Sequence, residues 1–82
     1  MSLTDYIQQA MATASYKLLD DKTYFGEIPG FRGVWANEKN LERCRKILQE
    51  ALEDWIVLKL RSQERLPAVH GKSLSLPHLV GA

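Results

Sequence analysis

The long amphipathic segment in the second half of the chain is the feature that most limits how this sequence can fold. From Leu41 to about Ser62, apolar side chains recur at the three- and four-residue spacing of a helix, with charged residues opposite. Asn40 precedes the segment as an N-cap, and Pro67 marks its end. The expected helix is about 33 Å long, so it needs an extended surface to cover its apolar stripe. That stripe is predicted to consist of Leu41, Cys44, Leu48, Ala51, Leu52, Trp55 and Leu58.

A stretch of short strands before the helix can provide that surface. Within residues 15–36, runs rich in aromatic and aliphatic residues are separated by turns that contain Asp or Pro, and the short connections favour an antiparallel sheet. Tyr24 and Ile28 are expected to face the helix, and Gly26 between them lets the helix come close. The predicted strands are residues 16–19, 23–28 and 34–36.

The remaining elements complete an α+β fold in a single domain of residues 1–82. Apolar spacing predicts a short amphipathic helix over residues 2–14, with Ser2 as its cap. Alternation over residues 72–76 predicts a fourth strand, followed by a tail. The expected architecture is an antiparallel sheet of three to four strands with one long helix packed on it and a short N-terminal helix.

Composition and charge narrow the classes of function. The 82 residues include 11 Lys and Arg against 10 Asp and Glu, and this near-balance argues against binding to nucleic acid or to an anionic membrane. No apolar run is long enough to span a bilayer, and the first residues lack the pattern of a signal peptide. The single cysteine cannot form an internal disulfide. These features predict a cytoplasmic protein.

Side chains able to perform catalysis or hold a metal are few and scattered. Asp20, Asp21 and Glu27 could form the site of a metal-dependent nuclease, but a solvated hairpin turn explains the two aspartates better. His70 and His78 lack the further ligands that zinc requires, and the cysteine lies in the apolar stripe. The sequence therefore predicts no catalytic residue, no metal site and no cofactor.

A basic cluster at the start of the long helix is the feature that points to nucleic acid. It consists of Arg43, Arg45 and Lys46. Interspersed carboxylates such as Glu42 and Glu50 cancel most of its field, so a solvated helix face is the favoured interpretation. Binding to nucleic acid through this cluster stays an alternative function.

Aromatic residues are more concentrated than a short sheet can bury. Strand alternation cannot turn all four aromatic residues between positions 24 and 35 inward, so at least one or two should be exposed or covered by a partner. We predict that Phe25, Phe31 and Trp35 bind a protein partner.

Aliphatic residues surround the last turns of the long helix on nearly every side. Trp55 and Leu58 are expected to point toward the core, which leaves other apolar side chains exposed. Ile56, Val57 and Leu60 are therefore predicted to form the interface of a homodimer or homotetramer.

The order and spacing of several short motifs resemble the HicB-like antitoxin family. The resemblance covers about residues 15–62. Lys22 stands where the hairpin of that family often has glycine, and Asn40 where its helix cap is often threonine. The motifs are LDDKTYFGEIPGFRGVWA at residues 19–36, NLE at residues 40–42 and QEALEDWI at residues 49–56.

This resemblance implies a bacterial, non-enzymatic protein-binding module. Its fold would be a partial ribonuclease-H-like arrangement without nuclease carboxylates, its partner a small basic toxin that cleaves messenger RNA, and its assembly a homo-oligomer. Residues 2–14 are additional to the minimal pattern of the family, which begins at the first strand. Residues 63–82 are too few for the DNA-binding extension that full antitoxins of the family add.

Overall fold

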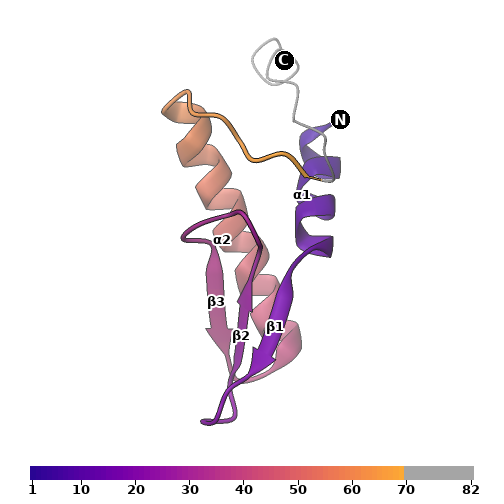
Figure 1. Cartoon of the computed structure of the whole chain (residues 1–82), viewed down its shortest axis with the longest axis vertical. Helices are drawn as coiled ribbons and strands as arrows, with labels where there is room; N and C mark the ends of the chain where they lie inside the picture. The colour runs from indigo at the N-terminus through magenta and orange to yellow at the C-terminus, as the bar shows by residue number, and fades with distance from the viewer. Residues whose placement is uncertain (70–82) are drawn as a thin grey trace.

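A three-stranded antiparallel sheet with one long helix on one of its faces forms the body of the protein (Figure 1). This computed structural model describes residues 1–69 and confirms the α+β fold. The strand predicted over residues 72–76, like His70 and His78, lies outside the described residues. The elements are α1 (Leu3–Ala12), β1 (Ser15–Leu18), β2 (Tyr24–Glu27), β3 (Trp35–Glu38) and α2 (Leu41–Arg61).

The sheet is ordered β1-β2-β3, and we call the face turned toward α2 the inner face. Gly26 lies at its centre, between Tyr16 of β1 and Ala36 of β3. A Cβ atom on Gly26 would lie 2.9 Å from the Tyr16 ring and 3.2 Å from the Cys44 Sγ of α2. The close approach of the helix predicted at this glycine is therefore confirmed.

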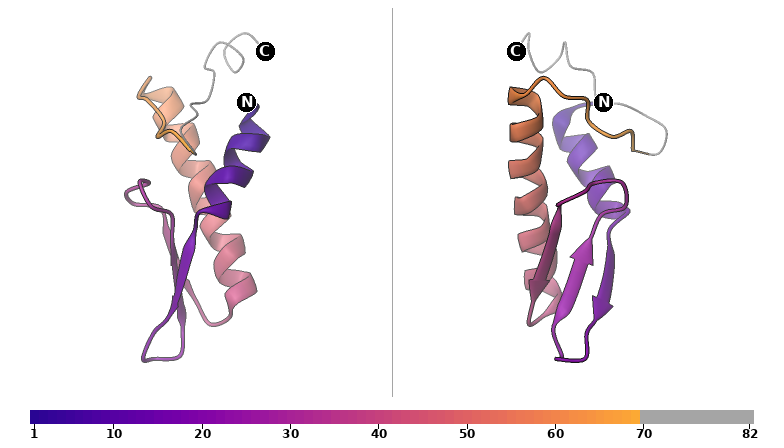
Figure 2. Two further views of the ribbon diagram at one scale, coloured as in Figure 1. Left: turned by 45° about the vertical axis from the view of Figure 1, so that its right-hand side comes forward. Right: turned by 60° about the vertical axis from the view of Figure 1, so that its left-hand side comes forward.

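The buried side of α2 is a line of residues spaced by four, namely Cys44, Leu48, Leu52 and Ile56. Each step of four residues turns about 40° beyond a full revolution, so the buried side rotates by roughly 120° along the helix. This rotation lets α2 face the sheet with one side and α1 with another (Figure 2). The predicted stripe is correct in its middle and wrong at its ends, because Leu41 and Leu58 are exposed.

Both predicted helix caps are confirmed. The Ser2 hydroxyl accepts a hydrogen bond from the Asp5 amide at 3.1 Å, and the Asn40 side chain accepts one from the Arg43 amide at 2.7 Å. Each cap satisfies a backbone donor that the first turn leaves free. The predicted helix over residues 2–14 is therefore confirmed, with its regular part at Leu3–Ala12.

The segment after α2, residues 62–69, crosses back to α1 over the upper part of the molecule, and we call it the crossing segment (Figure 2). The Tyr6 hydroxyl, which comes from α1, donates a hydrogen bond to the Pro67 carbonyl of this segment. Val69 is buried in the same core. Burial raises the pKa of Tyr6 to about 12.

The third strand begins later than the sequence predicted. Residues 34–36 were expected to form it, whereas β3 starts at Trp35 and runs to Glu38. The Val34 amide donates to the Phe31 carbonyl at 3.2 Å in a turn, and Gly33 within that turn has a positive φ of 85°. The turn holds Val34 outside the strand, and this displaces the start of the strand toward Trp35.

Candidate functional site

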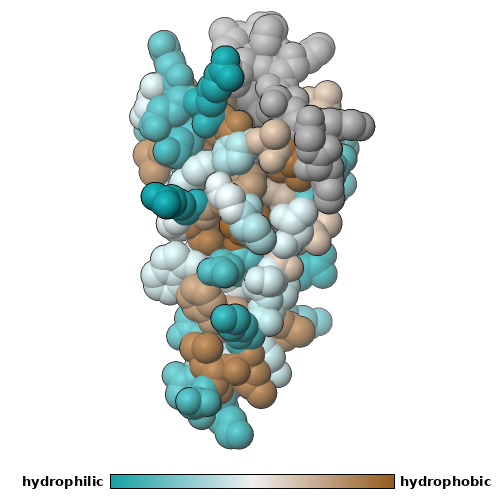
Figure 3. Space-filling view, in the orientation of Figure 1, coloured by the Kyte–Doolittle hydropathy of each residue, from teal (hydrophilic) through white to brown (hydrophobic). Residues whose placement is uncertain are grey.

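Two aromatic side chains stack on the open face of the sheet, the face turned away from α2. Phe25 and Trp35 come from adjacent strands, and their rings lie 6.0 Å apart at an interplanar angle of 23°. Trp35 is 56% exposed and Phe25 is partly buried. In Figure 1 the strands lie in front of α2, so Figure 3 shows this face, where apolar and polar side chains mix. The sequence prediction that one or two aromatics of this region are exposed is therefore confirmed.

A hydrogen-bonded network holds the strands beside this pair. The side-chain amide of Asn37 donates to the Thr23 hydroxyl at 2.8 Å and to the Tyr24 carbonyl at 2.9 Å. These two bonds tie β3 to the start of β2. Thr23 in turn donates to Asp21 through its hydroxyl and its amide. These two bonds lower the pKa of the exposed Asp21 carboxyl. The network fixes the strand register on which the aromatic pair depends.

The third aromatic residue predicted to bind a partner, Phe31, lies in the core instead. It is buried, and its ring lies 6.2 Å from that of Tyr6 and 5.2 Å from that of Trp55. Phe31 belongs to the loop between β2 and β3, where strand alternation does not decide which way a side chain points. The structure therefore places Phe25 and Trp35 together on the surface and separates Phe31 from them.

The end of α2 is less exposed than predicted. Ile56 is 2% exposed and belongs to the buried line, and Leu60 is partly buried, so Val57 is the one predicted interface residue that is exposed. Leu58, expected in the core, is 62% exposed beside it. The prediction that Leu58 points toward the core is wrong, because the buried side of the helix rotates along its length.

The carboxylates considered for a nuclease site do not come together. Asp20 and Asp21 lie in the turn before β2, whereas Glu27 lies at the far end of that strand, about 10 Å beyond its first residue Tyr24. Within residues 1–69 no three side chains of His, Cys, Asp or Glu gather in a way that could hold a metal ion. Asp21 instead serves the hairpin turn through its bonds to Thr23.

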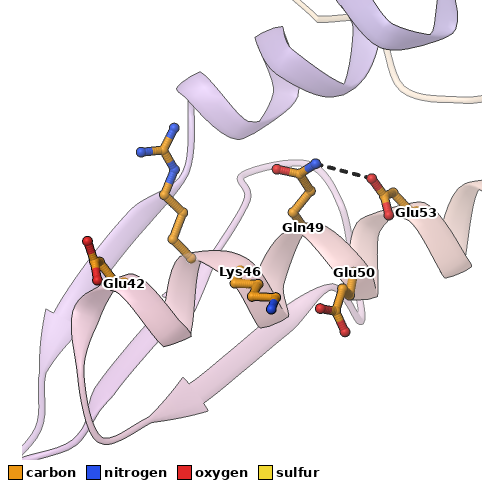
Figure 4. A pocket seen from close by; sticks show the side chains of 6 residues that line it. Glu42, Lys46, Gln49, Glu50 and Glu53 are labelled. Atoms are coloured by element: carbon orange, nitrogen blue, oxygen red, sulfur yellow. Dashed lines mark hydrogen bonds between the residues drawn. The ribbon is translucent and has the colours of Figure 1, made fainter.

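Arg43 is separated from the other two basic residues at the start of α2. At about 100° per residue, Arg43 and Arg45 are separated by roughly 160° around the helix. Arg43 forms an ion pair with Glu38 at 2.8 Å. Arg45 and Lys46 line a depression of about 420 Å³, whose other lining residues are the carboxylates of Glu42, Glu50 and Glu53 and the amide of Gln49 (Figure 4). The cluster therefore does not form one cationic surface, in agreement with a solvated helix face.

Cys44 has the surroundings of a structural residue. Its side chain is fully buried, and its Sγ lies 3.5 Å from the Tyr24 carbonyl and 3.6 Å from the Ala36 carbonyl. Burial raises the pKa of the thiol. A protonated, inaccessible thiol does not act as a nucleophile.

A groove runs between β1, the end of α1 and the start of α2, and sequence reasoning did not find it. It encloses about 410 Å³ and is lined by Met11, Ala12, Ala14, Tyr16, Leu41, Glu42 and Arg45. The groove exists because α2 covers β2 and β3 far more than β1. The one available signal was the alternation of apolar Ala14, Tyr16 and Leu18 along the first strand and the residue just before it.

Comparison with known proteins places this architecture in a family. A family model described as UPF0150-like matches residues 5–67, which include most of α1, the sheet, α2 and most of the crossing segment. The chain belongs to the UPF0150-like family. Among solved structures, it is similar to the crystal structure of TTHA0281 from Thermus thermophilus, with 45% sequence identity and a TM-score of 0.85. That similarity covers 93% of this chain and 95% of TTHA0281. No curated protein matches the chain.

The UPF0150-like match begins inside α1. The N-terminal helix, which is additional to the minimal HicB-like pattern, is therefore part of the UPF0150-like one. Within residues 1–69, neither helix of this UPF0150-like protein is long and apolar enough to cross a membrane.

Proposed function

We propose that this UPF0150-like protein is a non-enzymatic protein-binding module of the toxin–antitoxin type. In the HicB-like form of the proposal, it binds and neutralises a small basic toxin that cleaves messenger RNA in a bacterial cytoplasm. The open face of the sheet, centred on Phe25 and Trp35, is the proposed contact surface. Family membership is consistent with such a module.

The exposed aromatic pair is the observation that carries this proposal. A tryptophan that is more than half exposed adds little to the stability of a monomer, yet aromatic residues are enriched where interfaces gain most of their energy. Because Phe25 supports one side of the Trp35 ring, the ring is held in place before a partner arrives. A rigid aromatic anchor loses little conformational entropy on binding.

The surroundings of the pair have the character of an interface rim. In the strand register, Lys17 lies opposite Phe25, and Glu27 lies opposite Trp35. A small apolar centre bordered by charges of both signs is typical of protein–protein contacts. The non-enzymatic part of the proposal is supported by the scattered carboxylates and the buried thiol described above.

The proposal is tested by co-expressing the chain with the product of the neighbouring reading frame and measuring their affinity by calorimetry. Trp35→Ala should weaken binding about 30-fold, and Phe25→Ala should weaken it less, because an interface anchor typically contributes about 2 kcal/mol or more. Leu58→Ala is the matched control, since Leu58 is as exposed as Trp35 but lies on α2. We expect it to bind as the wild type does.

Two outcomes would overturn the proposal. The first is that the two proteins do not associate when co-expressed. The second is that they associate with an affinity that Trp35→Ala and Leu58→Ala reduce equally, because the open face would then have no special role.

A further inference from the structure

The outer edge of β1 carries backbone groups that no strand within residues 1–69 pairs. The Leu19 amide donates to the Thr23 carbonyl at 2.7 Å, so residues two and four positions before Leu19 also direct their backbone groups toward β2. The intervening residues, Tyr16 and Leu18, direct their N–H and C=O groups to the other side. Such an edge is a template for a further strand.

Apolar side chains accompany this edge on the inner face of the sheet. Ala14, just before β1, alternates with Tyr16 and Leu18 of the strand. Ala14 and Tyr16 line the groove between β1, α1 and α2, and Leu18 lies beyond its lining at the end of the strand. Leu18 is 59% exposed, and Leu41 across the groove is exposed as well. Apolar side chains reach the surface at the lower end of the molecule, where β1 enters the hairpin (Figure 3). The Tyr16 hydroxyl is buried without a hydrogen-bond partner in the described chain.

The two ends of the apolar row along β1 have complementary shapes. A large side chain, Leu18, projects at one end, and two small ones, Ala12 and Ala14, leave space at the other. A two-fold axis through Tyr16 would bring Leu18 of one copy opposite Ala14 of the other. Surfaces of this kind are self-complementary, as an interface between identical chains requires.

The charge on the strand selects the same register. With Tyr16 opposite its own copy, Lys17 lies opposite Ser15 of the second copy. If the axis passed through Lys17 instead, the two lysines would face each other, and like charges directly opposite destabilise a strand pair. In the favoured register, the N–H groups of Tyr16 and Leu18 meet the carbonyls of Tyr16 and Ala14 of the second copy.

We propose that two copies of this chain pair antiparallel along β1, with the two-fold axis at Tyr16 and the Leu18 side chain of each copy in the groove of the other. The two sheets then form one continuous sheet with both open faces on the same side. Each dimer presents two Phe25–Trp35 pairs in one direction. This surface is separate from the protein-binding face proposed above, and either proposal can fail without the other.

The mass in solution tests the proposal first. Light scattering after size exclusion at micromolar concentration should give twice the 9.4 kDa of one chain. Leu18→Glu should raise the dissociation constant at least about 10-fold, because it places a charge in an apolar contact. Leu58→Glu is the matched control on the end of α2 and should leave the dimer intact. The mass of one chain at every concentration would overturn the proposal, and so would a dimer that Leu58→Glu dissociates and Leu18→Glu does not.

A disulfide test fixes the register. Ser15 and Lys17 of opposite copies should lie within reach of a disulfide, so the double variant Ser15→Cys/Lys17→Cys should give a covalent dimer on oxidation. Lys17→Cys alone should stay largely unlinked, and the wild type is the control because Cys44 is buried. Efficient linking of Lys17→Cys alone, or no linking of the double variant, would overturn the register. A monomer whose Tyr16 and Leu18 amides resist hydrogen exchange would show that the chain covers its own edge, which would also overturn the proposal.

Discussion

The two faces of the sheet carry side chains of opposite size at their centres. At the centre of the inner face lie Gly26 and Ala36, and at the centre of the open face lie Phe25 and Trp35. The inner residues are small because α2 approaches so closely that a Cβ atom on Gly26 would meet Cys44. Small residues at the centre of the inner face therefore let α2 pack closely, and large ones at the centre of the open face are available for binding.

Adding volume to the inner face should have the largest effect on stability. Gly26→Val should lower the free energy of unfolding by about 3 kcal/mol, because the new methyl groups overlap the Tyr16 ring and the Cys44 Sγ. Urea unfolding followed by circular dichroism measures the change. Glu27→Val, on the next residue and the open face, is the control and should change stability by less than about 0.5 kcal/mol. Equal effects of the two variants would show that the faces do not differ in packing.

Raising the pH to alkaline values should have the next largest effect on stability, through the buried hydroxyl of Tyr6. Because the pKa of Tyr6 is raised to about 12 from an ordinary value near 10, the folded state holds its proton more tightly than the unfolded state. The contribution of this hydroxyl to stability is complete below pH 10 and should decrease by about 2–3 kcal/mol as the pH rises to 12.

Tyr6→Phe isolates this contribution. The variant should be less stable than the wild type by about 1–2 kcal/mol at neutral pH, because it leaves the Pro67 carbonyl without its donor. The advantage of the wild type should fall between pH 10 and 12 by the same amount, about 2–3 kcal/mol, and change sign before pH 12, since the other groups that titrate there are common to both. A difference that stays constant over that range would contradict the assignment.

A substitution in the hairpin turn should have a smaller effect on the free energy of unfolding, and this effect involves neither face of the sheet. Lys22 has a positive φ of 69°, a conformation that disfavours a residue with a Cβ atom. Lys22→Gly should raise the free energy of unfolding by about 1 kcal/mol. Lys22→Ala keeps the Cβ atom and should give no such gain, which separates the backbone effect from that of the lysine charge.

Truncating a side chain on the open face should have the smallest effect on the free energy of unfolding. Trp35→Ala should change the free energy of unfolding by less than about 1 kcal/mol, because more than half of the side chain is already in solvent. Thermal unfolding measured beside that of Gly26→Val shows the contrast directly. A loss as large as that of Gly26→Val would mean that Trp35 supports the fold and is not available for a partner.

Patterns with a fixed period were the predictable part of this molecule. The helix from Leu41, its Asn40 cap and the inward position of Gly26 follow from local spacing and capping chemistry, and all three are confirmed. Ile56 and Phe31 were assigned to the surface, although both are buried. The position of Ile56 depends on how the buried side of the helix rotates toward α1, and that of Phe31 on the path of a loop. Both are tertiary properties that no local period encodes.

The surface sites also combine features that a local sequence period predicts with features that depend on tertiary packing. Alternation along β2 and β3 predicted that aromatic side chains would be exposed, but it could not show that Phe25 and Trp35 stack on each other. That contact depends on the register between two strands. The groove beside β1 depends on which strands α2 covers, and the sequence of the helix alone does not predict this.

The hydrogen bond between Tyr6 and Pro67 joins residues 61 positions apart. The strand pairs of the β1-β2-β3 sheet, by contrast, link neighbours in the sequence and can form early, because short loops are quick to close. The Tyr6 bond gains nothing until α1, the sheet and α2 are in place, so we expect it to form after the rate-limiting step of folding. It should then influence how fast the native protein opens more than how fast it forms. The two segments it joins, α1 and the crossing segment, would be the first to separate when the protein opens.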